Sequence, residues 1–578
     1  MLKKILRILR PYWLLIILNP LFILGEIWTF TKLPELLSLI INQGIAQHDL
    51  VVIKNYGWQM IVFTVLEAIL SLGGLWCAAK TTIGITTDLR QKLFRRIQTF
   101  SFADLDHFGI GSLITRLTND ITIVQNTLIL LLRMALRAPI MLIVCVFILL
   151  KINSQLSLIL LASALVLIIA VVVLLKVALP LFIKSQKQLD DLNNTTEESL
   201  NAIKTIKTFV REKFIAARFA INNDNLTRTL LKMAKAMTVI FPIVMTMLNL
   251  SIVAVIWFGS NAIAANTANG MKVGDLVAFI NYTTQILFSF VMISFVFVMV
   301  LRSSASVKRL LAIINRETQL ADPKKPQAQA IDKGEIQFIN VNFSFRGERQ
   351  EYHEDQILTN INFSLAAGQK LGIIGGTGSG KSTLISLILR LYDVSSGQVL
   401  IDGVDVRHYP LQALRHGIGV VLQDTTLFSG TIKENLAWGD AAATLRELTG
   451  FTDMAQATGF INQTPEKFNH ELARQATNLS GGQKQRLSIA RALIKKAKIL
   501  ILDDATSAVD VKTEAEIWQA IRKSRRAITT IVVGQRISSV ADSDLILVLD
   551  KGQIVGHGSH EELLKHNHIY QEIYAAQQ

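Results

Sequence analysis

The chain has 578 residues, which is too long for one hydrophobic core and implies at least two domains. Its 51% hydrophobic residues and mean hydropathy of +0.39 exclude a soluble protein of average composition. The net charge of +15 arises in the first 330 residues, where 33 Lys and Arg accompany 17 Asp and Glu, against 26 and 27 in the remainder. These basic residues flank apolar runs, which indicates a membrane and excludes nucleic acid as a partner.

Six apolar segments in the first half are long enough to cross a bilayer, which takes roughly 20 residues each. They are centred on residues 13–42, 56–80, 132–152, 155–182, 235–263 and 275–301. The basic, amphipathic residues 1–10 are predicted to lie on the inner membrane surface before the first span. Six spans put both ends of this half on one side, and the Lys and Arg distribution puts that side in the cytoplasm. The two cysteines lie in apolar segments, so neither a disulfide framework nor a metal cluster is expected.

The connections between the spans differ sharply in length. Residues 81–131 and 183–234 are charged and helical in spacing, so we expect helices that continue the spans into the cytoplasm. The outward connections, around residues 47–49, 153–155 and 266–272, are short and nearly uncharged. A membrane anchor without transport function is the alternative interpretation of this pattern.

Polar and ionisable residues inside the spans are candidates for a substrate path. One face of the sixth span carries amides, Phe and Met at helical spacing: Asn281, Gln285, Phe288, Met292, Phe295 and Met299. This mixture suits an adaptable cavity for amphipathic compounds, or equally a seam where two helices pack. Glu26 and Glu67 also fall within spans, where charge is costly and often functional. They either attract cationic substrates or pair with a basic residue such as Arg133 or Arg137.

A change of pattern after residue 315 marks the second domain. Residues 316–334 include Asp-Pro-Lys-Lys-Pro, which breaks any helix and reads as a linker. Strand-like runs follow at 335–345, 370–375, 418–423, 497–504 and 528–534, and helical segments alternate with them. We therefore predict a six-span all-α membrane domain at 1–315 and a cytosolic α/β domain with a largely parallel sheet at 335–578.

The second domain contains a phosphate-binding loop between a strand and an apolar helix. Its residues are Gly375, Gly376, Thr377, Gly378, Ser379, Gly380, Lys381, Ser382 and Thr383. Glycines let backbone N–H groups turn toward phosphate oxygens at a helix N-terminus. The pattern predicts that Lys381 reaches the β- and γ-phosphates of a nucleotide and that the Ser382 hydroxyl ligates Mg²⁺. The apolar strand ending at Asp503 is predicted to deliver a second Mg²⁺-associated oxygen.

Several short motifs resemble those of the ABC transporter family. The signature motif of that family is matched by Leu479, Ser480, Gly481, Gly482 and Gln483. Gln423 resembles the Q-loop glutamine, which adds a Mg²⁺ ligand, and Ser507 to Asp510 resemble the D-loop. Phe345 stands where the family usually stacks an aromatic ring on adenine. The resemblance covers the whole chain and implies an exporter half-transporter of the type I layout. In that family, two such halves hold ATP between the phosphate loop of one and the signature of the other.

Two positions of the catalytic centre depart from the family pattern. The family places a Glu after the Mg²⁺-associated Asp as the general base, and this chain has Asp504. A carboxylate arm one methylene shorter moves the base by about 1 Å, and such a misplacement costs on the order of 10²-fold in rate. The family's switch histidine is replaced by Gln535, which cannot carry a proton's charge. Arg474 also stands where an acidic residue usually precedes the signature.

This combination resembles the degenerate-site subunit of bacterial heterodimeric multidrug exporters. The resemblance implies a partner half-transporter that supplies a competent Glu and His, with hydrolysis mainly at the partner's composite site. The family resemblance also implies that residues 102–112 and 204–213 form short helices that press on the nucleotide-binding domains, and ordinary amphipathic helices are the alternative. We therefore expect ATP-driven export of amphipathic compounds across a bacterial plasma membrane, with the nucleotide-binding domain and both termini in the cytoplasm. A lipid or peptide exporter is one alternative, and an ATP-binding regulatory or channel-like subunit is another.

Overall fold

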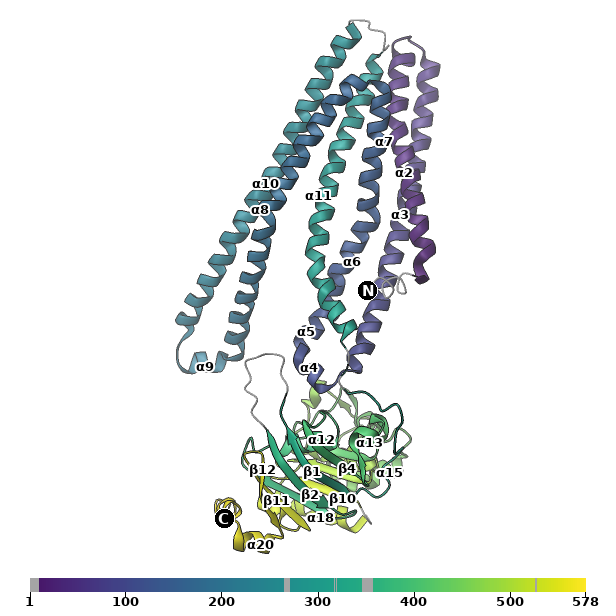
Figure 1. Cartoon of the computed structure of the whole chain (residues 1–578). Coiled ribbons are helices and arrows are strands. Elements are labelled where there is room, and N and C mark those ends of the chain that lie inside the picture. Colours follow the sequence, from purple (N-terminus) through teal and green to yellow (C-terminus); the bar gives the residue numbers. More distant parts are fainter. Residues whose placement is uncertain are drawn as a thin grey trace. The chain divides into compact units, whose positions relative to one another are not determined.

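The computed structural model describes residues 10–264, 271–316, 318, 320–345, 357–524 and 528–577 (Figure 1). The chain folds into two compact units. We call residues up to 98 together with 111–316 the helical unit, and residues 99–110 together with 317–578 the sheet unit. The surface helix expected at residues 1–10 lies outside the described residues except for Arg10.

Within its described residues, the helical unit contains six helices long and apolar enough to cross a membrane. Its elements are α2 (Trp13–Leu39), α3 (Leu50–Gln98), α5 (Ile110–Thr115), α6 (Ile121–Leu130), α7 (Leu136–Ile152), α8 (Ser154–Asn201), α9 (Ile203–Thr208), α10 (Glu212–Ala264) and α11 (Val273–Asn315). The π-helical segments Arg116–Asp120 and Leu131–Ala135 join α5, α6 and α7 into one long helix.

Helix length explains the long connections of the sequence. With a rise of about 1.5 Å per residue, the 48 residues of α8 extend about 72 Å, more than twice the roughly 30 Å hydrocarbon core of a bilayer. The 53 residues of α10 are longer still. Figure 1 shows α8 and α10 side by side and joined at one end by α9. The expected helical extensions are therefore continuations of the spanning helices.

The packed centre of the helical unit lies between α2, α7 and α11. Cys145, Leu149 and Phe279 are fully buried there. The Tyr282 hydroxyl donates a hydrogen bond to the Thr31 carbonyl oxygen at 2.6 Å, which ties α11 to α2. A buried hydroxyl needs such a partner, because burying it unpaired costs several times more than the bond contributes. These contacts fix the face of α11 that carries the predicted substrate-path residues.

The sheet unit is built on a six-stranded sheet with strand order β12-β11-β3-β10-β9-β6. Neighbouring strands are parallel except for the β11–β12 pair. The bounds are β3 (Lys370–Gly375), β6 (Ile418–Val421), β9 (Ile499–Asp503), β10 (Thr529–Val533), β11 (Leu545–Asp550) and β12 (Gln553–Gly558). The helices are α4 (Phe102–Phe108), α12 (Lys381–Ile388), α13 (Leu411–His416), α14 (Ile432–Ala437), α15 (Leu445–Met454), α16 (Thr458–Gln463), α17 (Gly481–Ile494), α18 (Val511–Ser524), α19 (Ile537–Val540), α20 (His560–His566) and α21 (His568–Ala575).

The strand predicted at 335–345 does not join this parallel sheet. As β1 (Ile336–Phe343) it forms an antiparallel sheet with β2 (Leu358–Leu365), β4 (Ser396–Ile401) and β5 (Val404–Asp405). Buried and less buried residues are mixed along β1, whereas every residue of β9 and β10 is buried. Strands covered on both faces read as continuous apolar runs, and strands covered on one face do not. A two-residue antiparallel pair, β7 (Gly430–Thr431) with β8 (Glu471–Leu472), completes the strands of the described chain.

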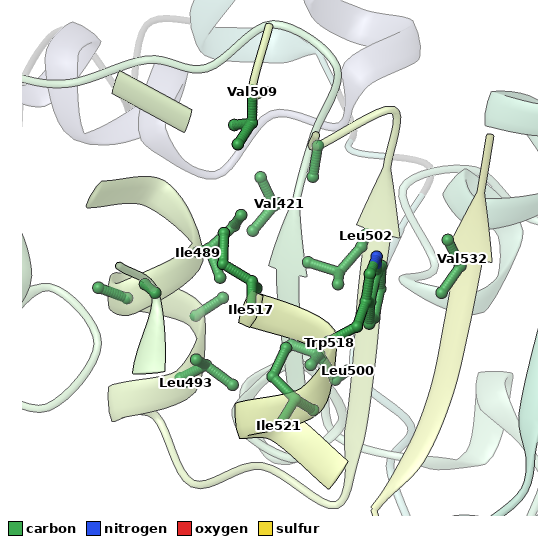
Figure 2. Close-up of a cluster of buried hydrophobic side chains, with 14 of the residues drawn as sticks. Val421, Ile489, Leu493, Leu500, Leu502, Val509, Ile517, Trp518, Ile521 and Val532 are labelled. Carbon is green, nitrogen blue, oxygen red and sulfur yellow. The ribbon is translucent and has the colours of Figure 1, made fainter. Parts of the chain in front are cut away.

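Two helices cover one face of the parallel sheet. Figure 2 shows side chains of α17 and α18 gathered against strand residues such as Leu500, Leu502 and Val532. Trp518 and Ile517 of α18 are almost completely buried in this layer. Burying each large apolar side chain stabilises the unit by roughly 1.5–3 kcal/mol. This packed layer therefore stabilises the strands whose carboxyl ends precede the site loops. The loops that follow these strands carry the predicted site residues.

Candidate functional site

The sheet brings the predicted nucleotide residues together at one edge. Four adjacent parallel strands, β3, β10, β9 and β6, end on the same side of the sheet. The loops after them hold the phosphate loop, Gln535, Asp504 and Gln423, respectively, and Asp503 is the last residue of β9. Ligands of open α/β sheets bind at the carboxyl ends of the strands, so the topology supports a single site here.

The phosphate loop needs glycine at several positions for different reasons. A Cβ at Gly375 would lie 2.1 Å from the Leu549 carbonyl oxygen on the neighbouring strand β11. Gly378 and Gly380 have φ of +80° and +98°, in the left-handed region that favours glycine. Around Gly376 and Gly378, no atom lies within 4 Å of an added Cβ, so the loop leaves open space beside its backbone. That space and the N-terminus of α12 fit phosphate oxygens.

Lys381 is held at the mouth of this loop. Its Nζ donates to the carbonyl oxygens of Gly375 and Gly376 at 2.9 and 2.7 Å. Burial lowers the pKa of Lys381, and the charges of Asp503 and Asp504 oppose that shift. The ammonium group therefore lies where a phosphate would replace backbone carbonyls as its partner.

Asp503 and Ser382 form an oxygen-rich pair next to Lys381. The Ser382 hydroxyl hydrogen-bonds the Asp503 carboxylate, whose residue is buried at the end of β9. Burial raises the pKa of Asp503, and the neighbouring Asp504 charge adds to that rise. A hydroxyl and a carboxylate are the hard oxygen donors that Mg²⁺ prefers, and a cation would offset the burial of the carboxylate. The residues present fit this ion.

Asp504 and Gln535 are in direct contact. Gln535 Nε2 donates to Asp504 Oδ2 at 3.1 Å, so the two departures from the family pattern form one pair. The backbone N–H of Asp504 donates to the Val533 carbonyl oxygen at 2.9 Å. Asp504 has φ of +50°, a left-handed conformation that Asp tolerates better than most residues. Burial raises the pKa of the Asp504 carboxyl, and Lys381 opposes the rise.

The remaining residues around the nucleotide edge are exposed. Gln423 lies in the loop directly after β6. Phe345 follows β1 and is 47% exposed, and its ring lies edge-on to Tyr392, with ring centres 5.1 Å apart. Tyr392 was not predicted from the sequence. Its hydroxyl donates to Asp106 Oδ2 of α4 at 3.0 Å, which links the segment expected at 102–112 to the aromatic side of the site.

The signature motif begins the helix α17. The Ser480 hydroxyl caps this helix by accepting from the Gln483 backbone N–H, and Gln483 in turn accepts from the Ser480 N–H. This capping box leaves Ser480 and Gly481 exposed at a helix N-terminus, a position that favours an anion. The Gln485 side chain, one turn further, donates to the Ser507 hydroxyl and accepts from the Ala508 N–H. It ties the D-loop to the signature helix, and Asp510 then caps α18 through the Thr513 N–H.

A buried carboxylate that the sequence did not single out connects two of these loops. Glu514 Oε1 accepts from the hydroxyls of Thr506 and Ser539, both at 2.7 Å. Thr506 belongs to the loop after β9, and Ser539 belongs to α19, after Gln535. Glu514 lies on an amphipathic helix, where an acidic residue is usually exposed to solvent. The sequence pattern therefore does not predict its burial.

The predicted path residues of the helical unit only partly share one cavity. A cavity of about 420 Å³ is lined by Asn281, Gln285, Phe288 and Met292 of α11 together with residues of α2, α7 and the π-helical segment before α7. Phe295 and Met299 do not line it. The Gln285 amide oxygen accepts from Cys145 Sγ at 3.4 Å.

The two carboxylates predicted for this path do not line the cavity. Glu26 is buried, with its side chain 4% exposed, and lies 3.3 Å from Arg137 Nε and 3.8 Å from Arg133 Nη2. Glu67 is half-buried and within electrostatic range of Arg137 and Glu26. Arg137 lines the cavity, although the sequence offered it only as an ion-pair partner. The sequence signal for a functional role of Arg137 is the presence of an arginine inside an apolar span.

Comparisons with known proteins connect both units. Residues 15–313 match the ABC transporter transmembrane region, and residues 358–507 match the ABC transporter domain. The uncharacterized ABC transporter ATP-binding protein YfiB of Bacillus subtilis is 37% identical over 577 residues, which cover 100% of this chain and 98% of that protein. The chain belongs to the ABC transporter family.

A further sequence relative and a solved structure show the exporter fold of this ABC transporter. The ATP-dependent lipid A-core flippase of Desulfotalea psychrophila is 32% identical over 493 residues, covering 85% of this chain and 84% of that protein. The solved structure of a bacterial Atm1-family ABC exporter with ATP bound matches with a TM-score of 0.80 and 25% identity, covering 99% of both chains. This chain is an ABC exporter half-transporter of the type I fold, with one transmembrane domain and one ATP-binding domain.

The geometry of the sheet edge fits the ATP that this domain of an ABC exporter binds. The loop backbone and the α12 N-terminus cradle phosphates, and Lys381 supplies a positive charge beside them. The exposed ring of Phe345 offers a face for the adenine base. What this arrangement lacks is a long carboxylate arm at residue 504 and a titrating side chain at residue 535.

Proposed function

We propose that this ABC exporter is one half of a heterodimer that exports amphipathic compounds across a bacterial plasma membrane, with its own ATP site retained for binding. Hydrolysis then occurs mainly at the partner's composite site, where the partner supplies Glu and His. The nucleotide-binding domain and both termini lie in the cytoplasm. Mg²⁺ accompanies ATP in this site, held by Ser382, Asp503 and Gln423.

The hydrogen bond between Gln535 and Asp504 carries the proposal. A general base must reach the attacking water and accept its proton. Here the carboxylate is one methylene short, and its Oδ2 is already engaged by the Gln535 amide at 3.1 Å. The amide cannot become cationic when charge develops on the γ-phosphate, as a histidine can. The phosphate loop beside them keeps every feature needed to bind a nucleotide.

The signature motif supports a role toward a second chain. Ser480 and Gly481 are exposed at the N-terminus of α17, whose backbone N–H groups favour an anion. Gln485 fastens the neighbouring D-loop to the same helix. In the family, the signature contacts the ATP held by the other half. An intact signature beside a weakened base therefore favours a pair of unlike halves.

Exposed apolar surface also supports a partner. Phe209 and Val210, directly after α9, are 70% and 79% exposed. In the sheet unit, the stacked rings of Phe428 and Trp438 are also exposed, with centres 4.3 Å apart. Exposed apolar side chains that adjoin one another, as in these two pairs, often mark interaction surfaces. A second half-transporter would cover both.

Export of a lipid is the second candidate function. It is favoured by the relatives named as ATP-dependent lipid A-core flippases, which are 32% and 31% identical to this chain. The cavity beside α11, with amides, Phe and Met in its wall, suits amphipathic molecules of either class.

Co-purification and vesicle transport test the proposal together. A tagged chain expressed in its native host should retain a homologous half-transporter with Glu and His at the two departed positions. Inverted vesicles containing the pair should then accumulate an amphipathic dye only when ATP is supplied. Labelled lipid moving in place of dye would favour the second candidate. ATP binding without movement of either would contradict export and favour a regulatory or channel-like subunit.

A further inference from the structure

The charge that faces the membrane cavity is positive. Arg137 is the one charged side chain among the described residues that line the cavity. Its side chain is 38% exposed, whereas the Glu26 side chain behind it is 4% exposed. The two carboxylates that the sequence marked for a substrate path therefore lie outside the cavity wall, and a guanidinium lies in it.

Glu26 does not balance this guanidinium completely. The same carboxylate also lies 3.8 Å from Arg133, so two cations share one anion. Arg133 has a further partner in the Ser71 hydroxyl, at 3.1 Å. Glu67 is within electrostatic range but forms no ion pair in the part of the chain that the structure describes. In a low-dielectric wall, an incompletely paired cation is costly, and an anion supplied from the cavity side would offset that cost.

The hydrogen-bonding capacity of Arg137 is also largely unused. Its Nε is buried and makes no hydrogen bond of normal geometry, despite its closeness to Glu26. Within the described residues, no hydrogen bond uses its Nη groups. A guanidinium has five N–H donors in a fork that matches a planar carboxylate or a sulfonate. Gln285 adds a neutral donor, because its oxygen is occupied by Cys145 while its NH₂ remains available.

The rest of the wall suits an apolar body attached to such an anion. Phe30 packs against the guanidinium, with the Arg137 carbon 5.7 Å from the ring centre. Phe288 and Met292 of α11 are exposed toward the same cavity. The volume of about 420 Å³ lies within the range of small-molecule sites. A π-helical segment, Leu131–Ala135, ends two residues before Arg137, and such segments often occur at functional sites.

We propose that this cavity binds amphipathic organic anions, with Arg137 as the residue that selects for the negative charge. The occupant is a free small molecule with one carboxylate or sulfonate on an apolar body. This inference rests on the proposed export function and narrows its substrate class. Of the two alternatives offered by the sequence for Glu26, it favours pairing with Arg133 and Arg137 over attraction of cationic substrates.

A binding experiment on the purified full-length chain in phosphatidylcholine nanodiscs tests this assignment. The probes are dansyl-labelled undecanoate, its primary amide and the corresponding amine, which share one apolar body. The variants are Arg137→Gln and the matched control Arg133→Gln, since both arginines pair with Glu26 but only Arg137 lines the cavity. Arg137→Lys preserves the charge. The double variant Arg137→Gln with Glu26→Gln avoids a stranded carboxylate if the single variant fails to fold.

We expect the wild-type chain to bind the carboxylate about tenfold more tightly than the amide, as one charge-assisted contact provides. Arg137→Gln and the double variant should bind both equally, whereas Arg133→Gln and Arg137→Lys keep the preference. No preference in the wild type, stronger binding of the amine, or equal loss in Arg133→Gln would overturn the assignment. Competition by phosphatidylglycerol would assign the cavity to a lipid headgroup and also overturn it. Because the assay needs neither ATP nor a partner, its result is separate from the success or failure of the transport test.

Discussion

The ATP-binding edge of the sheet unit and the cavity of the helical unit place their charges in opposite ways. At the sheet edge, Asp503 ends the fully buried strand β9 and Asp504 follows it. Their partners are Ser382 in the first turn of α12 and Gln535 in the loop after β10. At the cavity, neither Glu26, which is buried, nor Glu67, which is half-buried, belongs to the wall, and the charge in the wall is the Arg137 guanidinium. Parallel strands bring the residues at their carboxyl ends to one edge of the sheet. For residues on a spanning helix, the packing of the neighbouring helices decides which side chains face a cavity. The position of charge is therefore readable from sequence at the first site and only from structure at the second.

The largest expected effect separates this chain's contribution to the partner's ATP site from its own ATP site. Gly481→Asp in this chain should lower steady-state ATP hydrolysis by the co-expressed pair by on the order of 10²-fold, because the carboxylate would repel the γ-phosphate held by the partner. An added Cβ at Gly481 meets only the Ala508 Cβ at 3.5 Å, so the effect is one of charge. Gly481→Ala is the matched control and should retain most activity.

Lys381→Ala in this chain completes that comparison. It removes a phosphate contact from the site where little hydrolysis occurs, so the activity of the pair should fall only in part. Equal loss from Lys381→Ala and Gly481→Asp, or a greater loss from Lys381→Ala, would place the main hydrolysis in this chain's own phosphate loop.

A stability effect of intermediate size is expected within the phosphate loop. Gly375→Ala places a Cβ 2.1 Å from the Leu549 carbonyl oxygen, so β3 or β11 must shift, at a cost of about 2 kcal/mol. Gly376→Ala, where an added Cβ meets nothing within 4 Å, is the control. Thermal unfolding without nucleotide should show a lower Tm for the first variant and little change for the second. Equal Tm values would show that the close approach is relieved at no cost.

Repair of the base should have a small effect on its own. Asp504→Glu lengthens the arm but places Glu at a φ of +50°, which Asp tolerates better, and leaves Gln535 in place. We expect less than a doubling of hydrolysis by the pair, and a larger gain when Gln535→His is added. Gln535→His alone is the control. A twofold or greater rise from Asp504→Glu alone would show that Gln535 does not limit the site.

The smallest effect is expected at the aromatic side of the site. Tyr392→Phe removes the hydroxyl that donates to Asp106 of α4 but keeps the ring beside Phe345. The lost hydrogen bond contributes about 1 kcal/mol to the sheet unit. Because the segment that contains α4 is expected to press on the nucleotide-binding domain, transport per ATP hydrolysed should fall slightly. ATP affinity should be unchanged, because the ring beside Phe345 remains. A marked loss of ATP affinity would show that the hydroxyl, and not the ring, positions Phe345.

Much of this architecture follows from local sequence patterns. Apolar length predicted six spanning helices, the strand-loop-helix pattern predicted the phosphate loop, and an apolar run predicted the carboxylate at the end of β9. The antiparallel sheet around β1 was not predicted, because its strands are covered on one face and lack continuous apolar runs. Tyr392 and Glu514 were missed because their roles depend on partners more than 20 residues away in the chain, Asp106 and Ser539. The side of the cavity wall on which Arg137 lies depends on helix packing in the same way.

Hydrolysis by this chain alone tests the degenerate-site proposal most directly. ATP binding and steady-state hydrolysis should be measured on the same purified full-length chain, with the co-purified pair as reference. The chain alone should bind ATP and hydrolyse it on the order of 10²-fold more slowly than the pair, because Asp504 and Gln535 would occupy both of its sites. Turnover by the chain alone at a rate similar to that of the pair would contradict the assignment of hydrolysis to the partner's site.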